Sequence, residues 1–502
     1  MPGDDAAPTA RLSSSVEHHV LTDAVLRPLA SGAEHRPAIH AGAVTLSYGR
    51  LASAIARGAA ELDAELRPGS RILIASRDQS DVALGFLAAL ASRSIPLLAD
   101  PLSRERLREL AARFEVAAAM GEPALFAGTE VPVFAGERIA RWCAEPATPL
   151  VVPAVRRGDA AFWTFTSGTS GAPRAVVHAH EAPRAAYAGF AVQVVALSAR
   201  DVVASTAGLP FVYALGNALL FPLMAGAATI LPADLLLPTV IAAICRHRAS
   251  VLVSGPWSLE AMIRLVRRAE WRAGIAAIDR VLSAGEPLPP ALFGRWRETF
   301  GQRILENLGC TEMFNSFLSN RIDDAHPGCL GRPVAGYELQ VGGAPPRPGA
   351  RGALQVRGPS RAIAVSPANE GRLEPPRDAW HETGDEVAVD RKGRFVFLGR
   401  LDDRFKVKGE FVHPLEVERV LLEVPGVSEC LVAPGTDDHG LTAIVARIVS
   451  EPGVDAGALV RALRGHVRAR LPGHRRPLSI SVVDALPRNA RGKLERPRRA
   501  AS

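Results

Sequence analysis

The stretch FWTFTSGTSGAPRAVVH, residues 162–178, places an aromatic-rich run directly before a row of hydroxyls and glycines. The aromatic run favours a buried strand, and the row that follows favours a turn. Glycine lets the backbone approach a ligand closely, so this turn can present N–H groups and hydroxyls to an anion. Its spacing differs from that of the nucleotide loop GxxxxGK[ST], and no Lys-Ser/Thr pair follows. By itself, the stretch leaves a phosphate-binding loop and a flexible Ser/Gly connection equally open.

On either side of this stretch, apolar strands alternate with helical patterns, which favours a layered α/β fold. Ser47 is positioned to cap a helix from about Gly49, and Asp81 to open the next helix. The expected strands are RILIAS, IPLLAD, ATILPA and SVLVSG, at residues 71–76, 95–100, 228–233 and 250–255.

The texture of the sequence changes after residue 336. YELQV and GALQVRG, separated by Pro345, Pro346 and Pro348, favour short β-hairpins. After GRFVFLGR, a helix–strand–strand–helix–strand pattern indicates a separate small unit. We therefore expect a large layered α/β N-terminal domain with a β-rich end over residues 1–400, of which 1–18 form a loose leader. A small, mobile α+β C-terminal domain is expected over residues 401–502.

The composition is that of a globular chain. Of its 502 residues, 48% are hydrophobic and 22% are charged. No segment reaches the about 18 uninterrupted apolar residues of a membrane span. The N-terminal MPGDDAAPTARLSSS lacks the apolar centre of a secretion signal. Five scattered cysteines, without metal-ligand spacing, fit a reduced, cytoplasmic compartment.

The net charge of +7 is concentrated in arginines near the C-terminus. A basic tail can bind nucleic acid, but few aromatics interleave with these arginines to stack on bases. Leu459, Leu463, Val467 and Leu471 recur every four residues, so many of the arginines lie on the wet face of a packed helix. We expect a solvated basic surface and no nucleic-acid partner.

Further segments follow the loop in order: GEPLP at 285–289, GCTEM at 309–313, TGDE at 383–386, GRLDDRFKVKGEFVHPLEVE from 399 and PRNARGKLER from 487. With the loop, they resemble the AMP-forming adenylating enzymes, which include acyl-CoA synthetases, peptide-synthetase adenylation domains and luciferases. The resemblance extends from about residue 45 to the C-terminus. Within this superfamily, FWTFTSGTSG, FVYALGNALLFPLMAGA, TEMFNSFLSN and GRPVAGYEL are most similar to benzoate-type aryl-CoA ligases.

The resemblance implies an AMP-forming acid–thiol ligase. A carboxylate is a poor electrophile, and joining it to the α-phosphate of ATP makes an acyl-adenylate that a thiol can attack. The expected substrate is a benzoate-like aryl acid, with or without an amino or hydroxy substituent, and CoA is the expected acceptor. The alternative is a stand-alone adenylating enzyme that passes the acyl group to a carrier-protein phosphopantetheine or to an amine. ATP and Mg²⁺ are the other implied cofactors, and a monomer or homodimer without a membrane partner is expected.

The resemblance also implies how ATP is bound. Arg174 adds charge near the phosphates, where many relatives carry Lys. Asp385 offers two acceptor oxygens to the ribose hydroxyls. The implied phosphate loop is Thr166, Ser167, Gly168, Thr169, Ser170 and Gly171, and the other implied ATP contacts are Gly285, Glu286, Pro287, Arg400 and Lys406.

The implied catalytic group is Lys493, Thr311, Glu312 and Arg400. Lys493 bridges the substrate carboxylate and the α-phosphate, Thr311 bonds the α-phosphate, and Glu312 holds Mg²⁺ as a hard oxygen ligand. From the residues alone, Thr311 and Glu312 could instead be a helix-capping pair, and Lys493 one more solvated cation of the basic tail.

By the same resemblance, an acyl pocket is formed by Phe211, Val212, Tyr213, Gly255, Ala284, Gly309, Cys310 and Asn315. Most of these residues are small or aromatic, which suits a flat ring, although ordinary core packing favours the same residue types. Asn315 stands where benzoate ligases typically have His, and its amide offers a donor and an acceptor to a ring substituent.

The segment after residue 400 is implied to change position between the two half-reactions. Asp402 is the implied hinge, and Lys408 and Gly409 are implied to line the thiol channel. Many CoA ligases have Ser where Lys408 stands. Lys408 could therefore meet the CoA phosphates, an acidic carrier-protein helix or only water.

Overall fold

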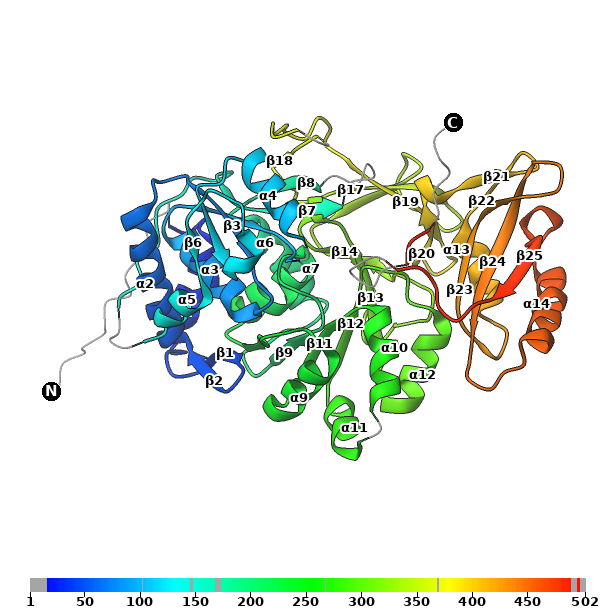
Figure 1. The fold of residues 1–502 in the computed structure, drawn as a ribbon, viewed down its shortest axis with the longest axis horizontal. Coiled ribbons are helices and arrows are strands. Elements are labelled where there is room, and N and C mark those ends of the chain that lie inside the picture. The colour runs from blue at the N-terminus through cyan, green and yellow to red at the C-terminus, as the bar shows by residue number, and fades with distance from the viewer. Residues whose placement is uncertain are drawn as a thin grey trace. The chain divides into compact units, whose positions relative to one another are not determined.

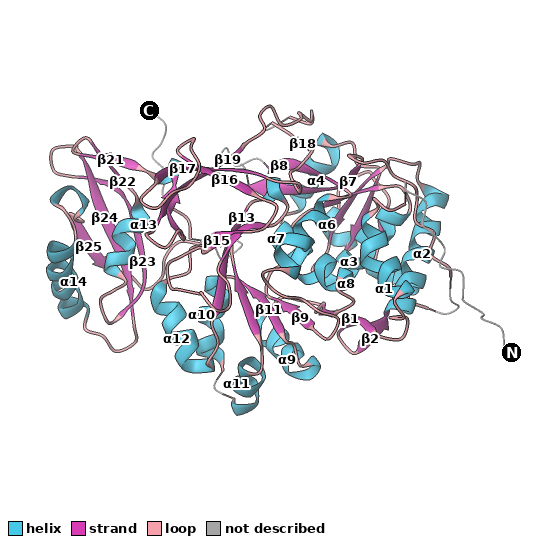
Figure 2. Cartoon of the chain, turned by 180° about the vertical axis from the view of Figure 1, so that it is seen from behind, coloured by secondary structure: helices cyan, strands magenta, loops and turns pink. Residues whose placement is uncertain are grey.

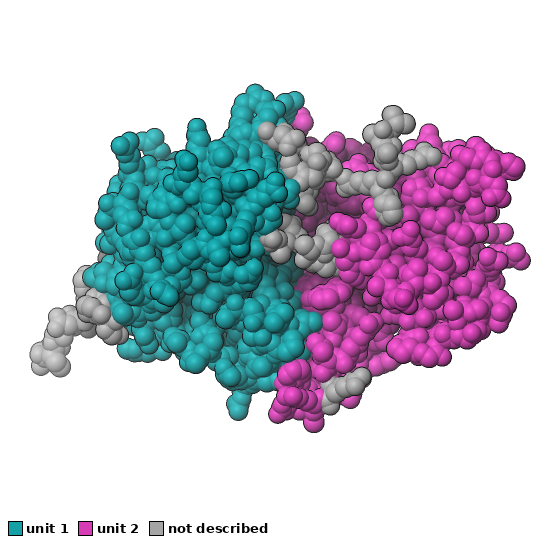
Figure 3. All heavy atoms as spheres, in the orientation of Figure 1, with its two compact units in different colours: residues 1–253, 311–315, 359–377 teal, residues 254–310, 316–358, 378–502 magenta. Residues whose placement is uncertain are grey.

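The computed structural model describes residues 16–101, 103–144, 148–167, 173–266, 268–367, 370–488 and 494–496. The chain divides into two compact units, shown in different colours in Figure 3. Unit 1 contains residues 1–253, 311–315 and 359–377, and unit 2 contains residues 254–310, 316–358 and 378–502. Both units combine helices with sheets, so the α/β fold expected from the sequence is confirmed. None of the helices described in either unit is long and apolar enough to cross a membrane.

The aromatic-rich run forms β7, which pairs with β8 as an antiparallel hairpin in unit 1. This pair belongs to a seven-stranded sheet in the order β18-β8-β7-β4-β3-β5-β6. The neighbours from β7 to β6 run parallel, as do strands that are joined by helical crossovers. The bounds are Arg71–Ala75 (β3), Ile95–Leu98 (β4), Ala118–Gly121 (β5), Val133–Phe134 (β6), Ala160–Ser167 (β7), Pro173–Ala179 (β8) and Ala364–Val365 (β18).

Helix α3 (Gln79–Ala91) packs against β3, β4 and β5 and against helix α2 (Tyr48–Glu65), as Figure 1 shows. The prediction that Ser47 caps α2 is confirmed, because its side chain accepts a hydrogen bond from the N–H of Arg50. Nearly every residue of α3 is buried, which explains why its sequence is apolar on all sides.

The prediction that Asp81 opens α3 is wrong. The helix begins at Gln79, and the side chain of Asp78 accepts from the N–H of Ser80. Asp78 has the extended backbone that an N-cap requires, whereas Asp81 already lies in the first turn of the helix.

A second group of strands in unit 1 has the order β11-β9-β10-β1-β2, parallel except for the hairpin of β1 and β2. These strands are Pro37–Ala41 (β1), Val44–Ser47 (β2), Val202–Ser205 (β9), Ala228–Ile230 (β10) and Val251–Ser254 (β11). The other α-helices of the unit are Arg27–Ala30 (α1), Arg104–Arg113 (α4), Gly136–Arg141 (α5), Ala182–Ala186 (α6), Val212–Leu215 (α7), Phe221–Met224 (α8) and Leu237–His247 (α9). Thr22–Leu26 (η1), Tyr187–Val192 (η3) and Gly216–Leu220 (η4) are π-helical turns, and Pro123–Phe126 (η2) is a 3₁₀ turn.

Unit 2 begins with alternating helices and strands, visible in Figure 2 as the group around α10, α11 and α12. β12 and β13 run parallel, and β14 and β15 extend this order by antiparallel pairing. The bounds are Pro256–Leu265 (α10), Ala269–Ala276 (α11), Arg280–Ser283 (β12), Pro290–Phe300 (α12), Ile304–Gly309 (β13), Ser316–Ser319 (β14) and Arg332–Pro333 (β15).

An antiparallel sheet in the order β16-β17-β19-β20 follows in unit 2. The expected hairpin is confirmed, since β16 (Glu338–Val341) pairs with β17 (Arg351–Arg357). The TGDE segment lies inside a long strand, β19 (His381–Val389), which pairs with β20 (Phe395–Arg400). This sheet therefore holds Asp385 on β19 and Arg400 on β20, two residues that the sequence predicted to bind the nucleotide.

The last part of unit 2 has its own core. Helices α13 (Pro414–Leu421) and α14 (Ala456–Arg470) pack together and against a three-stranded sheet. The expected stripe of α14 is confirmed, because Leu459, Leu463 and Val467 are all buried. The three-stranded sheet consists of Val427–Thr436 (β23), Thr442–Ser450 (β24) and Ser479–Val482 (β25). Phe405–Val407 (β21) and Glu410–Val412 (β22) form a separate two-stranded sheet, and 3₁₀ turns lie at Leu401–Asp403 (η6) and Gly473–Arg475 (η7).

Candidate functional site

Asp385 and Arg400 face each other across the antiparallel pair of β19 and β20. Nη1 of Arg400 donates a hydrogen bond to Oδ1 of Asp385 at 2.8 Å and another to the carbonyl of Thr383 at 2.7 Å. Asp385 is buried, whereas Arg400 is exposed. The structure therefore brings together two residues that the sequence predicted, separately, to bind the nucleotide.

The backbone beside this pair is shaped by a glycine. Gly384 has a φ of +74°, and a Cβ at this position would lie 2.7 Å from Nη2 of Arg400. The N–H of Asp385 donates to Oγ1 of Thr383 at 3.1 Å, and that hydroxyl donates to the carbonyl of Leu354 at 3.0 Å. Gly384 thus lets the guanidinium lie against the strand, and Thr383 links the strand to β17.

The charge of Arg400 is secured by its neighbours. Burial lowers the pKa of Arg400, but the carboxylates of Asp385, Asp402 and Asp403 outweigh burial, so the net shift of this pKa is upward. The guanidinium consequently stays positive at any assay pH, as arginine does generally.

Thr311 and Glu312 lie in a short 3₁₀ turn, Thr311–Met313 (η5), and not at the start of an α-helix. Within unit 1, the N–H of Ala362 donates to the carbonyl of Glu312 at 2.8 Å. The Oγ of Ser360 donates to the carbonyl of Met313 at 2.7 Å. These two bonds hold the backbone of the turn, so the side chains of Thr311 and Glu312 are presented from a fixed position.

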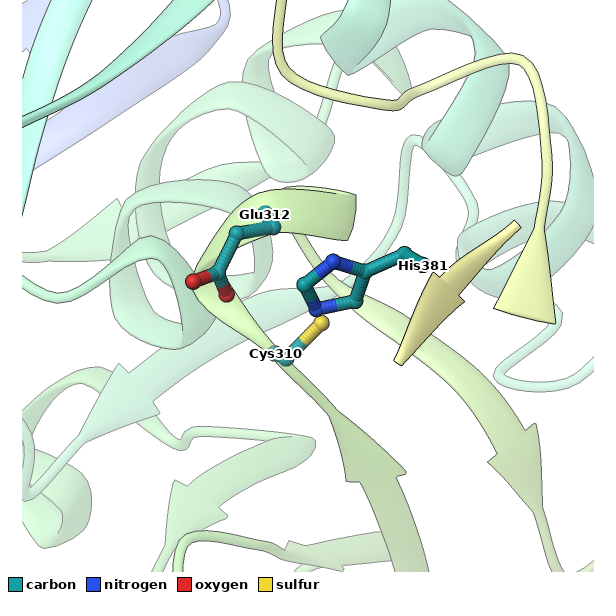
Figure 4. A group of neighbouring side chains, drawn as sticks. All are labelled: Cys310, Glu312 and His381. Atoms are coloured by element: carbon teal, nitrogen blue, oxygen red, sulfur yellow. The ribbon is translucent and has the colours of Figure 1, made fainter. Parts of the chain in front are cut away.

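Cys310 and His381 of unit 2 bring their side chains close together, as Figure 4 shows. The Sγ of Cys310 and a ring nitrogen of His381 lie within 4.8 Å of each other. His381 is the first residue of β19 and shares a face of the strand with Thr383 and Asp385. Sequence reasoning had singled out Cys310 and Glu312 but not His381.

Asn315, predicted to line the acyl pocket, is buried and hydrogen-bonded within unit 1. Its Nδ2 donates to the carbonyl of Val212 at 3.3 Å, and its Oδ1 accepts from Nδ2 of Asn217 at 3.1 Å. Asn217 also donates to the carbonyl of Tyr213 at 2.9 Å. The structure thus joins Asn315 to two predicted pocket residues, and Asn217 orients its amide.

The helix that carries Val212 and Tyr213 changes form where it meets Asn315. The α-helical turn α7 follows the half-buried Phe211 and passes into the π-helical turn η4 at Gly216. A Cβ on Gly216 would lie 2.4 Å from Nδ2 of Asn315. Glycine is therefore required for Asn315 to lie against the helix, and π turns of this kind are frequent at functional sites.

The other predicted pocket residues belong to unit 2, and each lies at or just after the end of a strand. Gly255 follows β11, and Ala284 follows β12. The N–H of Ala284 donates to the carbonyl of Ser254 at 3.3 Å, and a Cβ on Gly255 would lie 3.4 Å from the carbonyl oxygen of Ala284. Gly255 and Ala284 are therefore neighbours. Gly309 ends β13, and Cys310 follows it.

The predicted adenine turn, residues 285–287, follows β12 and starts at the exposed Gly285, whose φ is +89°, while Glu286 and Pro287 are half-buried. The loop is anchored at its end, because the N–H of Leu288 donates to Oε1 of Glu306 at 2.9 Å. Burial raises the pKa of Glu306 to about 7, against the opposing effects of the Leu288 N–H and of Arg419.

Thr166 and Arg174 face each other at the end of the β7–β8 hairpin. Nε of Arg174 donates to the carbonyl of Ser366 at 3.3 Å, and the N–H of Ala175 donates to the hydroxyl of the same serine at 2.8 Å. Arg174 is thus tied to the protein at one nitrogen. The predicted residues Gly168, Thr169, Ser170, Gly171 and Lys493, and the side chain of Ser167, lie outside the described part of the chain.

The predicted hinge and thiol-channel residues surround a small hairpin. Asp402 is exposed on η6, and Lys406 is exposed on β21 with its Nζ 4.9 Å from the centre of the Phe411 ring. Lys408 and Gly409 form the two-residue turn between β21 and β22, with φ of +51° and +84°. A positive φ at both positions is the type I′ geometry that matches the twist of a hairpin.

Sequence signals existed for the two residues that were missed. His381 alternates with Thr383 and Asp385 in HETGD, which places all three on one face once the segment is known to be a strand. Asn217 lies four residues after Tyr213, the spacing of one helical turn. Neither signal could be used from the sequence, because it does not show that Asn217 lies against Asn315 or that His381 lies near Cys310.

Comparison with known proteins shows the family of this chain. Residues 27–364 match the AMP-binding enzyme family, and residues 416–493 match the AMP-binding enzyme C-terminal domain. The chain therefore belongs to the AMP-binding enzyme family, with a large N-terminal and a small C-terminal domain. The boundary after residue 400, the mobility of the small domain and the hinge at Asp402 stay predictions.

Three of the similar proteins are ligases named for aryl acids. The chain is 34% identical over 453 residues to benzoate–CoA ligase of Thauera aromatica, covering 86% of this chain and 85% of that protein. It is 32% identical over 480 residues to p-hydroxybenzoic acid–AMP ligase of Mycobacterium tuberculosis strain H37Rv, covering 92% and 66%. Among solved structures, the anthranilate CoA ligase AuaEII in complex with anthranoyl-AMP matches with a TM-score of 0.85 and 25% identity, covering 94% and 95%.

Proposed function

We propose that this enzyme activates an aryl carboxylic acid with ATP to an acyl-adenylate, releasing pyrophosphate, and then transfers the acyl group to CoA. The observation that carries the proposal is the pairing of Asp385 with Arg400, joined by a 2.8 Å hydrogen bond. It leaves a carboxylate with fixed orientation and a permanent cation at one place, which suits a ribose and a phosphate. Family membership and the similarity to aryl-acid ligases support the same reaction.

The remaining catalytic roles follow from charge. Bringing a carboxylate towards triphosphate requires positive charge that is in position before the reaction. Lys493 is proposed to supply it by bridging the substrate carboxylate and the α-phosphate, while Thr311 donates to that phosphate. Glu312 presents a half-buried carboxylate, the hard oxygen donor that Mg²⁺ prefers, so it fits a magnesium ion that neutralises phosphate charge.

The acid is proposed to be a benzoate-like ring with a polar substituent. The amide of Asn315 is oriented by Asn217 and Val212, so it can select a substituent by hydrogen bonding instead of adapting to several. Gly255, Ala284 and Gly309 contribute little side-chain volume, which suits a flat ring. The similar proteins are named for benzoate, p-hydroxybenzoic acid and anthranilate, which differ in this kind of substituent.

Fewer observations bear on the acyl acceptor than on the acid. CoA is favoured by the similarity to benzoate–CoA ligase over most of both chains. The p-hydroxybenzoic acid–AMP ligase keeps the alternative open, in which the acyl group passes to a carrier-protein phosphopantetheine or to an amine. The cytoplasmic location and the monomeric or homodimeric state stay predictions.

The test combines an acid panel with an acceptor assay. Pyrophosphate release is measured with ATP, Mg²⁺ and benzoate, its amino and hydroxy derivatives, and medium-chain fatty acids. CoA is then added, and thioester is measured by mass spectrometry. We expect pyrophosphate release to be fastest with an aryl acid. We also expect thioester to form when CoA alone is added.

Two outcomes would contradict parts of this proposal. Faster pyrophosphate release with a medium-chain fatty acid than with every aryl acid would overturn the substrate class. An adenylate that forms but yields thioester only with a phosphopantetheinylated carrier protein would replace CoA by the alternative acceptor.

A further inference from the structure

Phe314 has a strained backbone immediately before Asn315, the predicted acyl-pocket residue of unit 1. Its φ is +61°, a left-handed conformation that bulky residues rarely adopt and that costs free energy. The N–H of Phe314 donates to the carbonyl of Thr311 at 3.0 Å, and the N–H of Asn315 donates to the carbonyl of Met313 at 2.7 Å. A hydrogen bond between residues two apart, around a positive φ, indicates a γ-turn of the rare and strained kind. Such a turn persists only where its surroundings hold it.

The ring of Phe314 anchors this turn in the interior of unit 1. The side chain is fully buried, and its ring centre lies 5.7 Å from that of Phe162, 5.4 Å from that of His178 and 6.1 Å from that of Phe221, all in T-shaped contacts. Phe162 and His178 face each other across β7 and β8, and burial lowers the pKa of His178 to about 3, so its ring stays neutral. T-shaped pairs at these distances are favourable. Three separate elements, β7, β8 and α8, therefore hold one ring.

The anchor of the turn is continuous with the surroundings of the Asn315 amide. A Cβ on Gly216 would lie 3.0 Å from the ring of Phe221 and 2.4 Å from Nδ2 of Asn315, so the ring and the amide both lie against this glycine. On its other side, the amide accepts the hydrogen bond from Asn217 at 3.1 Å. The orientation of the amide therefore depends on where the turn places the backbone of Asn315.

We propose that Phe314 is a positioning residue for the acid, because its ring holds the strained turn that orients the Asn315 amide towards a ring substituent. Phe314 is fully enclosed, so it acts through Asn315 and not by contact with the acid. The effect on acid selectivity rests on the proposed function, in which Asn315 binds the substituent. The anchoring of the turn does not depend on that function.

The first experiment measures the turn in the full chain without substrate, by hydrogen–deuterium exchange. Phe314→Ala removes the ring, so the amides of residues 311–315 should exchange at least about tenfold faster, since lost packing favours local opening. Phe134→Ala is the control, because it removes another fully buried ring of unit 1, on β6, and should leave the exchange of residues 311–315 unchanged.

Thermal unfolding of two variants tests the strained backbone itself. Glycine adopts a positive φ without the steric cost that alanine has, so Phe314→Gly should unfold at a higher temperature than Phe314→Ala. The reverse order, which is usual on ordinary backbone, would overturn the strained turn. Equal exchange of residues 311–315 in Phe314→Ala and wild type would overturn the anchoring. Neither result requires enzymatic activity.

The second experiment is a double-mutant cycle on acid selectivity. Its readout is the ratio of kcat/KM for the substituted benzoate that wild type prefers to kcat/KM for benzoate, measured by pyrophosphate release. Phe314→Ala and Asn315→Ala should each lower this ratio about 2–10-fold, the contribution of one hydrogen bond, whereas Phe134→Ala should not change it. Because Phe314 acts through Asn315, the double variant should have the same ratio as Asn315→Ala alone.

The outcomes of the cycle separate this inference from the proposed function. If Asn315→Ala lowers the ratio but Phe314→Ala does not, or if the two effects add in the double variant, Phe314 does not position Asn315. If Asn315→Ala leaves the ratio unchanged, the proposed role of Asn315 is wrong, and with it the selectivity assigned to Phe314.

Discussion

Nη1 of Arg400 bridges the side chain of Asp385 and the carbonyl of Thr383, at 2.8 Å and 2.7 Å. Both partners lie on β19, and Gly384 between them leaves space for the guanidinium. The pair is therefore built into a sheet and does not depend on a flexible loop. A site on a strand is positioned more rigidly than one on a loop.

Replacing Asp385 by Asn should weaken ATP binding. The amide keeps the shape but loses one charged acceptor, and a hydrogen bond to a charged group contributes about 1.5–3 kcal/mol, or about 10–100-fold in KM for ATP. Initial rates of pyrophosphate release against ATP concentration measure this. Glu382→Gln, an exposed neighbour on the same strand, is the control and should leave KM for ATP unchanged.

Lys493→Ala should separate the two half-reactions. Loss of one positioned donor typically slows a step by about 10²–10³-fold, and only adenylate formation requires Lys493 between carboxylate and phosphate. Thioester formation from a pre-made adenylate should remain close to wild type, with Arg464→Ala as the control for lost basic charge. Equal loss in both half-reactions would contradict the role of Lys493.

Gly216→Ala should destabilise the acyl side of the site. The new Cβ would lie 2.4 Å from Nδ2 of Asn315 and 3.0 Å from the Phe221 ring, and overpacking of this kind costs about 1–3 kcal/mol. KM for the acid should rise more than KM for ATP. Gly294→Ala in α12 adds the same methyl group where nothing lies within 4 Å, so it should be neutral or slightly stabilising. Thermal unfolding of both variants measures the loss of stability, and KM for the acid and for ATP measures the effect on each side of the site.

Lys408→Asn tests the acceptor. Asn tolerates the positive φ of +51° at this turn position, so the β21–β22 hairpin should keep its stability within about 0.5 kcal/mol. If the Lys408 charge meets CoA phosphates, KM for CoA should rise several-fold, and the difference from wild type should shrink with added salt. Adenylate formation should not change. An unaltered KM for CoA, as expected for the exposed control Lys392→Asn, would show that Lys408 does not meet the CoA phosphates.

Glu306 makes the stability of unit 2 depend on pH. Burial raises its pKa to about 7 in the folded chain, above the ordinary value of 4.5. The folded state then holds the proton more tightly, so this stabilising contribution is complete below about pH 4.5 and is lost as pH rises through about 7.

Glu306→Gln removes this dependence and can keep the bond from Leu288. From about pH 5 to about pH 8, the variant should gain stability relative to wild type, at most on the order of 3 kcal/mol. Thermal unfolding across this pH range measures the gain. A difference that is constant with pH, as expected for the exposed Glu298→Gln, would mean that Glu306 is not buried in its neutral form.

Much of the local structure followed from sequence patterns. The hydroxyl of Ser47 caps α2 as predicted, and the four-residue repeat of Leu459, Leu463 and Val467 is buried. The start of α3 was placed two residues late, because Asp78 and Asp81 are both suitable caps and only the backbone conformation distinguishes them. These features depend on residues a few positions apart, which is why a single sequence can indicate them.

The sequence itself therefore determined the family and predicted the nucleotide-binding residues, because motifs and periodicity are local. Only the tertiary structure decided that Asn217 orients Asn315, that His381 converges on Cys310, and that Glu306 is enclosed. Proximity and burial arise when segments far apart in the chain pack together. The hydrogen-bond partners of Asn315 and the raised pKa of Glu306 are products of that packing, and no short stretch of sequence carries them.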